Sequence, residues 1–185
     1  NATTQPLSFI DALFTATSAV CVTGLIVVDT ATYYTTFGQV IIMGLIQIGG
    51  LGILTFVTYF SYFFKGGVSY ETQLSISEMS YMRGTGNVGA TLKSILYVTF
   101  AVEALAAAFI YASIYDLPGM DVSERLFFSI FHAVSAFCNA GFSTFSAGLY
   151  DDALRFNYPL QLIIGITFIF GGMGFVIVVN VLRYL

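Results

Sequence analysis

The sequence predicts an all-α membrane protein in which one structural unit occurs twice. Hydrophobic residues make up 57% of the 185 residues and charged residues only 9%, whereas a soluble domain carries about 25% charged residues. Residues 30–64 and residues 157–182 are the two longest runs without a charged residue. Each is longer than the roughly 20 residues of helix that cross a bilayer core. The third observation is a short motif that recurs far along the chain.

The recurring motif is a twelve-residue segment with a cysteine and a glycine near its end. Residues 14–25 read FTATSAVCVTGL and residues 131–142 read FHAVSAFCNAGF, with six of the twelve positions identical. A second similarity follows each copy, GGLG at residues 49–52 and GGMG at residues 171–174. The same parts in the same order predict a duplicated structural unit.

The repeat divides the chain into two units and a connection between them. We expect the first unit at residues 1–64, a polar connection at residues 65–90 and the second unit at residues 91–185. The second unit opens with a further span at about residues 93–115, which has no counterpart in the first. Because the chain lacks an initiator methionine, we expect it to be part of a longer protein.

A short helix is predicted at the start of each duplicated motif. Ser8 with Asp11, and Asp121 with Glu124, have the spacing of a helix-capping box. From these starts the apolar stretches run to about position 20 in the first copy and about position 137 in the second. A helix of about 10 to 14 residues is too short to cross a bilayer, which predicts a half-helix that enters the membrane and returns.

The charged residues predict the orientation of the chain. The side with the half-helix starts carries Arg125 and Arg155 together with seven acidic residues, Asp11, Asp29, Asp116, Asp121, Glu124, Asp151 and Asp152. The opposite side carries the basic excess, with Lys65, Arg83, Lys93 and Arg183 against Glu71 and Glu78. Since basic residues favour the cytoplasmic side, we expect the half-helices to enter from outside. The acidic outer surface would concentrate cations; ordinary solubilising acids are the alternative for each single residue.

The connection at residues 65–90 is the largest polar surface predicted on the inner side. We expect a soluble partner to dock on it, with Glu78 and Arg83 as contact residues. A plain linker between the two units is the alternative.

The glycine turns that follow the half-helices are suited to binding an ion. Backbone carbonyls replace the hydration shell of an ion without placing a fixed charge in the membrane. Carbonyls that point the same way need alternating backbone conformations, and glycine adopts positive φ at little cost. The half-helices also direct their partly negative C-terminal ends to the turns, which favours a cation. The carbonyls predicted to bind it belong to Val22, Thr23, Gly24, Leu25, Asn139, Ala140, Gly141 and Phe142. A loop that only packs is the alternative.

These motifs resemble a known family. Residues 12–30, with TFGQ at 36–39 and QIGGLG at 47–52, are similar to the first repeat of the Trk/Ktr/HKT superfamily of potassium transporters. Residues 131–143 are similar to its second repeat, and the similarity is greatest to the membrane subunit of bacterial Ktr-type systems. The resemblance implies four repeats of outer helix, pore helix, filter and inner helix around one pore. This chain would hold the first repeat without its outer helix and the second repeat complete.

The resemblance also implies a function, which is passive and gated potassium uptake across the cell membrane of a bacterium. The filter glycines of the family correspond to Gly24 and Gly141; glycine at the first of these goes with potassium selectivity, and serine with sodium-selecting plant relatives. Cys138 departs from the asparagine typical of its place in Ktr-type proteins. The implied assembly is a homodimer on a ring of cytosolic regulatory subunits that bind nucleotide, so this chain itself would carry no cofactor.

Several other residues have alternative interpretations. For the glycines of the inner helices we favour close helix packing, which small residues allow, over a gating hinge. These glycines are at positions 49, 50, 52, 171, 172 and 174. For Glu103, at mid-membrane depth, we favour burial against the other unit over a direct ion site. His132 is expected to pack or hydrogen-bond rather than relay protons, and Cys21 and Cys138 to be inherited copies rather than a disulfide. Candidates for hydrogen bonds to the filter backbone are Thr15, Thr17, Ser18 and Ser135.

Two other function classes compete with conduction. A non-conducting membrane scaffold would have no need for glycine at both positions 24 and 141. A genuine two-repeat protein that dimerises would be expected to carry an outer helix before both half-helices. The sequence has no pattern of a side-chain metal site, a catalytic triad or a phosphate-binding loop, so we expect neither an enzyme nor a nucleic-acid partner.

Overall fold

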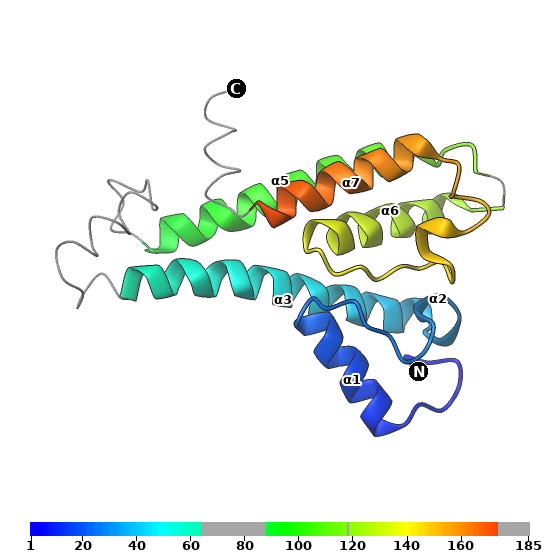
Figure 1. Cartoon of the computed structure of the whole chain (residues 1–185), viewed down its shortest axis with the longest axis horizontal. Coiled ribbons are helices and arrows are strands. Elements are labelled where there is room, and N and C mark those ends of the chain that lie inside the picture. Colours follow the sequence, from blue (N-terminus) through cyan, green and yellow to red (C-terminus); the bar gives the residue numbers. More distant parts are fainter. Residues whose placement is uncertain (64–87, 118, 174–185) are drawn as a thin grey trace.

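The computed structural model describes residues 1–63, 88–117 and 119–173, and in these ranges the fold is helical (Figure 1). The elements are α1 (Phe9–Val20), α2 (Thr30–Tyr33), α3 (Thr36–Phe63), α5 (Val88–Ser113), α6 (Val122–Phe137), the 3₁₀ helix η2 (Gly148–Tyr150) and α7 (Tyr158–Gly172). The extended backbone of the described part forms one isolated antiparallel bridge, between Thr3 and Tyr34. The predicted all-α class is confirmed.

The half-helices α1 and α6 begin where the sequence predicts. The Ser8 hydroxyl accepts a hydrogen bond from the Asp11 backbone N–H at 3.1 Å, and the Glu124 carboxylate accepts one from the Asp121 N–H at 3.1 Å. α1 has 12 residues and α6 has 16, so α6 is slightly longer than expected. At a rise of 1.5 Å per residue these helices extend about 18 and 24 Å, short of a hydrocarbon core of about 30 Å.

The described residues contain one helix that is long and apolar enough to cross a membrane. It lies within α5 and comprises the 19 residues Ile95–Ser113. α3 is helical for 28 residues, about 42 Å at the same rise. α7 follows Asn157, whose side-chain oxygen accepts from the Leu160 N–H at 3.1 Å, and it is described as far as Gly172. The end of the predicted span at residues 157–182 lies outside the described residues.

Helix α3 lies between α1 on one side and the α5–α6–α7 bundle on the other (Figure 1). One apolar cluster joins the two units, with Ile42 and Ile46 of α3 packed against Phe131 and Val134 of α6. A second cluster lies within the second unit and joins α5, α6 and α7. The two halves therefore share a core, which holds the two half-helices in a fixed relation.

A polar contact also joins the two units inside the apolar bundle. Glu103 of α5 is only 5% exposed, and its carboxylate oxygen accepts a hydrogen bond from the Gln47 side-chain nitrogen of α3 at 3.0 Å. This is the burial against the other unit that the sequence favours. An ionisable group at such a position is costly unless it is paired, and the amide of Gln47 provides a partner.

The glycines of the inner helices allow the backbones to touch. A Cβ on Gly49 of α3 would overlap with the carbonyl of Val20 at the end of α1, and a Cβ on Gly171 of α7 would overlap with the carbonyl of Phe137 at the end of α6. The packing interpretation is confirmed at these two positions. Gly50 is also in close contact, with the Cys138 sulfur, whereas Gly52 has no neighbour within 4 Å of its Cβ position among the described residues. Gly174 lies outside the described residues.

Replacing Gly49 by alanine should therefore destabilise the protein. The new methyl group would meet a backbone carbonyl, which cannot move without displacing α1, and such overpacking costs about 1–3 kcal/mol. Gly52→Ala is the matched control on the same helix: it has open space, and replacing a helical glycine with alanine gains up to about 1 kcal/mol. Thermal unfolding of the full-length protein in detergent measures both. Equal effects of the two substitutions would contradict the packing assignment.

Candidate functional site

The two glycine turns have the same backbone conformation. In the first turn Val22 and Gly24 have φ values of 54° and 78°, and in the second Asn139 and Gly141 have φ values of 59° and 73°. Left-handed residues thus alternate with ordinary ones in both copies. This is the alternation that the sequence argument requires of carbonyls directed to one side.

Matching hydrogen bonds fix both turns to the ends of their half-helices. In the first turn the Val22 N–H donates to Ala19 at 3.2 Å and the Thr23 N–H donates to Ser18 at 2.9 Å. The residues 117 positions later form the same two bonds, at 3.0 and 2.8 Å. This pair of bonds is the Schellman motif, which ends a helix with one left-handed residue. The duplicated sequence therefore folds into a duplicated structure.

Val22 is an unusual residue for the left-handed position of this motif. Glycine or asparagine normally occupies it, and a β-branched residue at positive φ is an outlier. Such a conformation costs about 1–3 kcal/mol and persists only where the surroundings enforce it, often at functional sites. Asn139 holds the same position in the second turn with much less strain, because asparagine tolerates this conformation.

The two turns lie against each other although they belong to different units. The Ala140 carbonyl oxygen is so close to Gly24 that a Cβ there would overlap with it. The Ala140 side chain is buried in the cluster that joins the units. α1 and α6 both end directly before these turns, so the partly negative ends of two helices meet at one place. The arrangement favours a cation.

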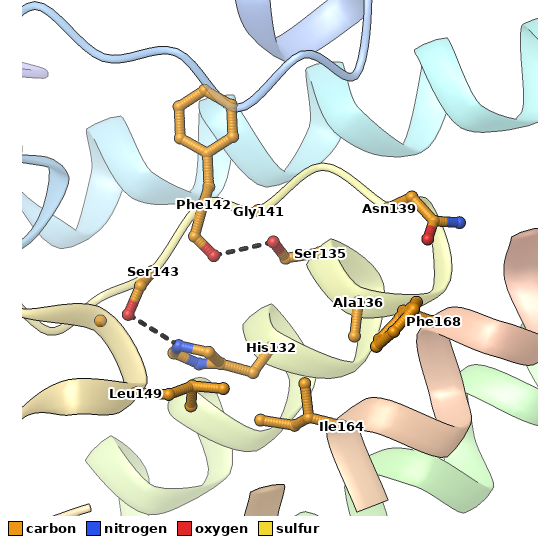
Figure 2. A pocket seen from close by; sticks show the side chains of 11 residues that line it. His132, Ser135, Ala136, Asn139, Gly141, Phe142, Ser143, Leu149, Ile164 and Phe168 are labelled. Carbon is orange, nitrogen blue, oxygen red and sulfur yellow. Dashed lines mark hydrogen bonds between the residues drawn. The ribbon is translucent and has the colours of Figure 1, made fainter. Parts of the chain in front are cut away.

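Side chains of α6 support the second turn from behind (Figure 2). The Ser135 hydroxyl donates to the Phe142 carbonyl at 2.7 Å. His132 Nδ1 lies 2.9 Å from the Phe128 carbonyl, which can only accept, so Nδ1 carries the proton and Nε2 accepts from the Ser143 hydroxyl at 3.0 Å. His132 is thus a hydrogen-bonding group of the scaffold, as expected. These residues line a cavity of about 270 Å³ behind the turn.

The Phe142 carbonyl is therefore already engaged. Of the four carbonyls predicted to bind an ion in the second turn, this one is directed back to α6 by Ser135. The equivalent serine of the first unit, Ser18, is buried, and its hydroxyl has no hydrogen-bond partner among the described residues. The first turn thus lacks the serine bond of the second, although its Thr23 hydroxyl donates to the Ser18 carbonyl at 3.4 Å.

Of the other hydroxyl candidates, Thr15 donates to the Asp11 carbonyl at 2.9 Å within its own helix and does not reach the turn. Sequence reasoning missed Ser143, whose hydroxyl also accepts from the Phe145 N–H at 3.0 Å. Its position directly after the repeated motif is the signal that could have identified it. Both cysteines are free thiols in the structure. Glu78 and Arg83, the predicted partner contacts, lie outside the described residues.

Comparison with known proteins identifies the family. The chain matches the family model of TrkH, a cation transport protein, over residues 1–184. It is 41% identical over 183 residues to Ktr system potassium uptake protein B of Bacillus subtilis. The matched region covers 98% of this chain and 40% of that protein. The protein of the same name from Vibrio alginolyticus is 41% identical over 180 residues, covering 96% of this chain and 38% of the relative.

A third relative is Potassium/sodium uptake protein NtpJ of Enterococcus hirae, 38% identical over 177 residues, covering 95% of this chain and 38% of that protein. The chain thus spans about two fifths of the length of the curated relatives it matches. The match confirms the resemblance seen in the motifs, and it places the chain in the cell membrane, among transporters and not among enzymes. The chain belongs to the TrkH family of cation transport proteins.

Proposed function

We propose that this chain is part of the pore-forming subunit of a potassium uptake system in the cell membrane. The observation that carries the proposal is the pair of glycine turns, which come from two units, share one backbone conformation and meet at the ends of two half-helices. The strained Val22 supports conduction over a scaffold role, because a loop that only packs has no need of such a backbone.

Potassium would pass through this path passively, with backbone carbonyls in place of its water shell. In the first turn the carbonyls of Val22, Thr23, Gly24 and Leu25 would serve as ligands. In the second turn those of Asn139, Ala140 and Gly141 would do so, and Phe142 would hold the strand through Ser135. By resemblance to the family, Gly24 favours potassium over sodium. Two of the relatives are named as potassium uptake proteins.

The full-length protein would contain four repeats around the pore, of which this chain supplies the first two. We propose that it forms a homodimer and that a cytosolic nucleotide-binding regulator gates it. The regulator would contact the connection between the units, at residues 65–90, with Glu78 and Arg83 as contact residues. The support for this step is the polar composition of that segment and the basic excess that marks its side as cytoplasmic.

Gly24→Ser in the full-length protein should lower the preference for potassium over sodium by about tenfold, which corresponds to 1.4 kcal/mol of discrimination. Gly141→Ser should have a smaller effect. Both serines would be strained at positive φ, but the Gly24 position also faces the Ala140 carbonyl, whereas Gly141 has open space. Competition between the two ions in a flux assay with reconstituted protein measures the preference.

Gly119→Ser is the matched control, because Gly119 has a φ of 84° and open space outside the turns. It imposes the same backbone strain and should leave the preference unchanged. Unchanged selectivity in both Gly24→Ser and Gly141→Ser would rule out a filter role for these turns.

Cysteines placed at Ser69 and Thr85 should be protected from an impermeant thiol reagent in intact cells and labelled in inside-out vesicles. The parent protein without the added cysteines sets the background, to which Cys21 and Cys138 contribute. Charge reversal at Glu78 and Arg83 should then weaken activation by the regulator while leaving ion selectivity unchanged. Labelling from outside would overturn the topology, and a change in selectivity without loss of activation would place the segment on another functional surface.

A further inference from the structure

The side chain of Asn139 binds the inner helix of its own unit. One orientation of its amide satisfies two groups of α7: the nitrogen donates to the Phe168 carbonyl at 3.2 Å, and the oxygen accepts from the Gly172 N–H at 3.2 Å. The opposite orientation offers one longer bond instead, from the nitrogen to the Phe137 carbonyl at 3.4 Å. Toward α7 it would place donor against donor and acceptor against acceptor. Figure 2 shows the Asn139 side chain beside Phe168. A residue of the second turn is thus bonded twice to the main chain of α7.

The two backbone groups that Asn139 binds belong to a single helical turn. Phe168 and Gly172 are four residues apart, so the carbonyl of one and the N–H of the other are the partners of one α-helical hydrogen bond. An amide alongside that bond gives each group a second partner outside the helix. Side chains that enter the hydrogen-bond ladder in this way determine where a helix bends or ends. The described part of α7 ends at Gly172.

The turn itself does not need this amide. Val22 occupies the equivalent position in the first unit, has nearly the same φ and forms the same Schellman bonds, yet valine has no polar side chain. The residue of α3 that corresponds to Gly172 is Gly50, and its neighbour is the Cys138 sulfur instead. The contact of Asn139 with α7 is therefore not needed to form the turn, and the equivalent Val22 of the first unit cannot form it.

The amide lies next to the closest backbone contact of that unit. Gly171 touches the carbonyl of Phe137 at the end of α6, and Gly172, its neighbour, binds Asn139. The end of the half-helix and the start of the turn are thus attached to consecutive residues of α7. Any displacement of α7 at this point either breaks the amide bonds or moves the turn.

We propose that the Asn139 side chain is a positioning residue that aligns the second filter strand through α7. It acts through the backbone of Asn139, Ala140 and Gly141 and does not itself touch the ion. The proposal rests on the function proposed above, since it assigns these carbonyls to the ion path. In the first unit the equivalent residue, Val22, has no polar side chain and forms no such bond.

The test compares Asn139→Val and Asn139→Asp with the parent in full-length protein. Valine removes both bonds but supports the same turn in the first unit; aspartate keeps the shape and the acceptor for Gly172 but cannot donate to Phe168. Both should lower the preference for potassium over sodium by about tenfold, the effect of losing one or two hydrogen bonds. Hydrogen exchange at the Gly172 amide should become about tenfold faster in Asn139→Val.

Asn157→Val is the matched control. Asn157 also forms two amide bonds to backbone, to the Ser113 carbonyl at 2.8 Å and from the Leu160 N–H at 3.1 Å, but it does so at the opposite end of α7. Its loss removes the same number of amide bonds to backbone and should also lower the melting temperature. It should leave ion preference at the parental value, which separates positioning from general stability.

Parental ion preference in both Asn139 variants would overturn the proposal, as would a loss of preference in Asn157→Val as large as theirs. Failure of the parent to carry potassium would instead reject the proposed function. In that case the exchange measurement still decides on the contact: parental exchange at Gly172 in Asn139→Val would reject it, and faster exchange would keep it as a structural bond between the turn and α7.

Discussion

The close approach of two main chains is the constraint on which this structure depends. At Gly49 and Gly171 the inner helices touch the last carbonyls of the half-helices, and only a residue without a side chain permits this. The contact sets the depth at which each half-helix stops. The left-handed turn that follows can then start at the same depth in both units. A helix end inside a membrane needs such support, because lipid offers no partners for backbone groups.

The turns of the two units have the same backbone conformation, but different side-chain hydrogen bonds hold them. In the second, Ser135 binds the Phe142 carbonyl, His132 binds Ser143 and Asn139 binds α7. In the first, Ser18 has no partner for its hydroxyl among the described residues, and Val22 holds a strained conformation without a polar side chain. Side chains therefore hold the second turn at three places, whereas in the first turn the Thr23 hydroxyl donates to the Ser18 carbonyl.

Much of this arrangement could be predicted from sequence, because it depends on local signals. Ser8 and Asp121 mark the starts of the half-helices, and Gly24 and Gly141 mark left-handed positions at their ends. Contacts between segments distant in sequence could not be predicted, such as Asn139 with Phe168 or Glu103 with Gln47, since a single sequence carries no signal for which polar groups meet. The bond from Ser135 to the filter backbone was among the predicted candidates and is confirmed, whereas its acceptor, the Phe142 carbonyl, was predicted only as an ion ligand. The boundaries of the units and the roles of Glu78 and Arg83 stay predictions.

The duplication also has a consequence for how such a protein evolves. In a channel of four identical subunits every mutation enters the pore four times, so few changes are tolerated. Here the turns are encoded separately, and a change such as that from valine at position 22 to asparagine at position 139 affects one strand alone. The hydrogen bonds that define the turns run between main-chain atoms, which substitution does not remove. Half of the motif has therefore been free to diverge while its geometry was preserved, and each strand can be adjusted by selection on its own.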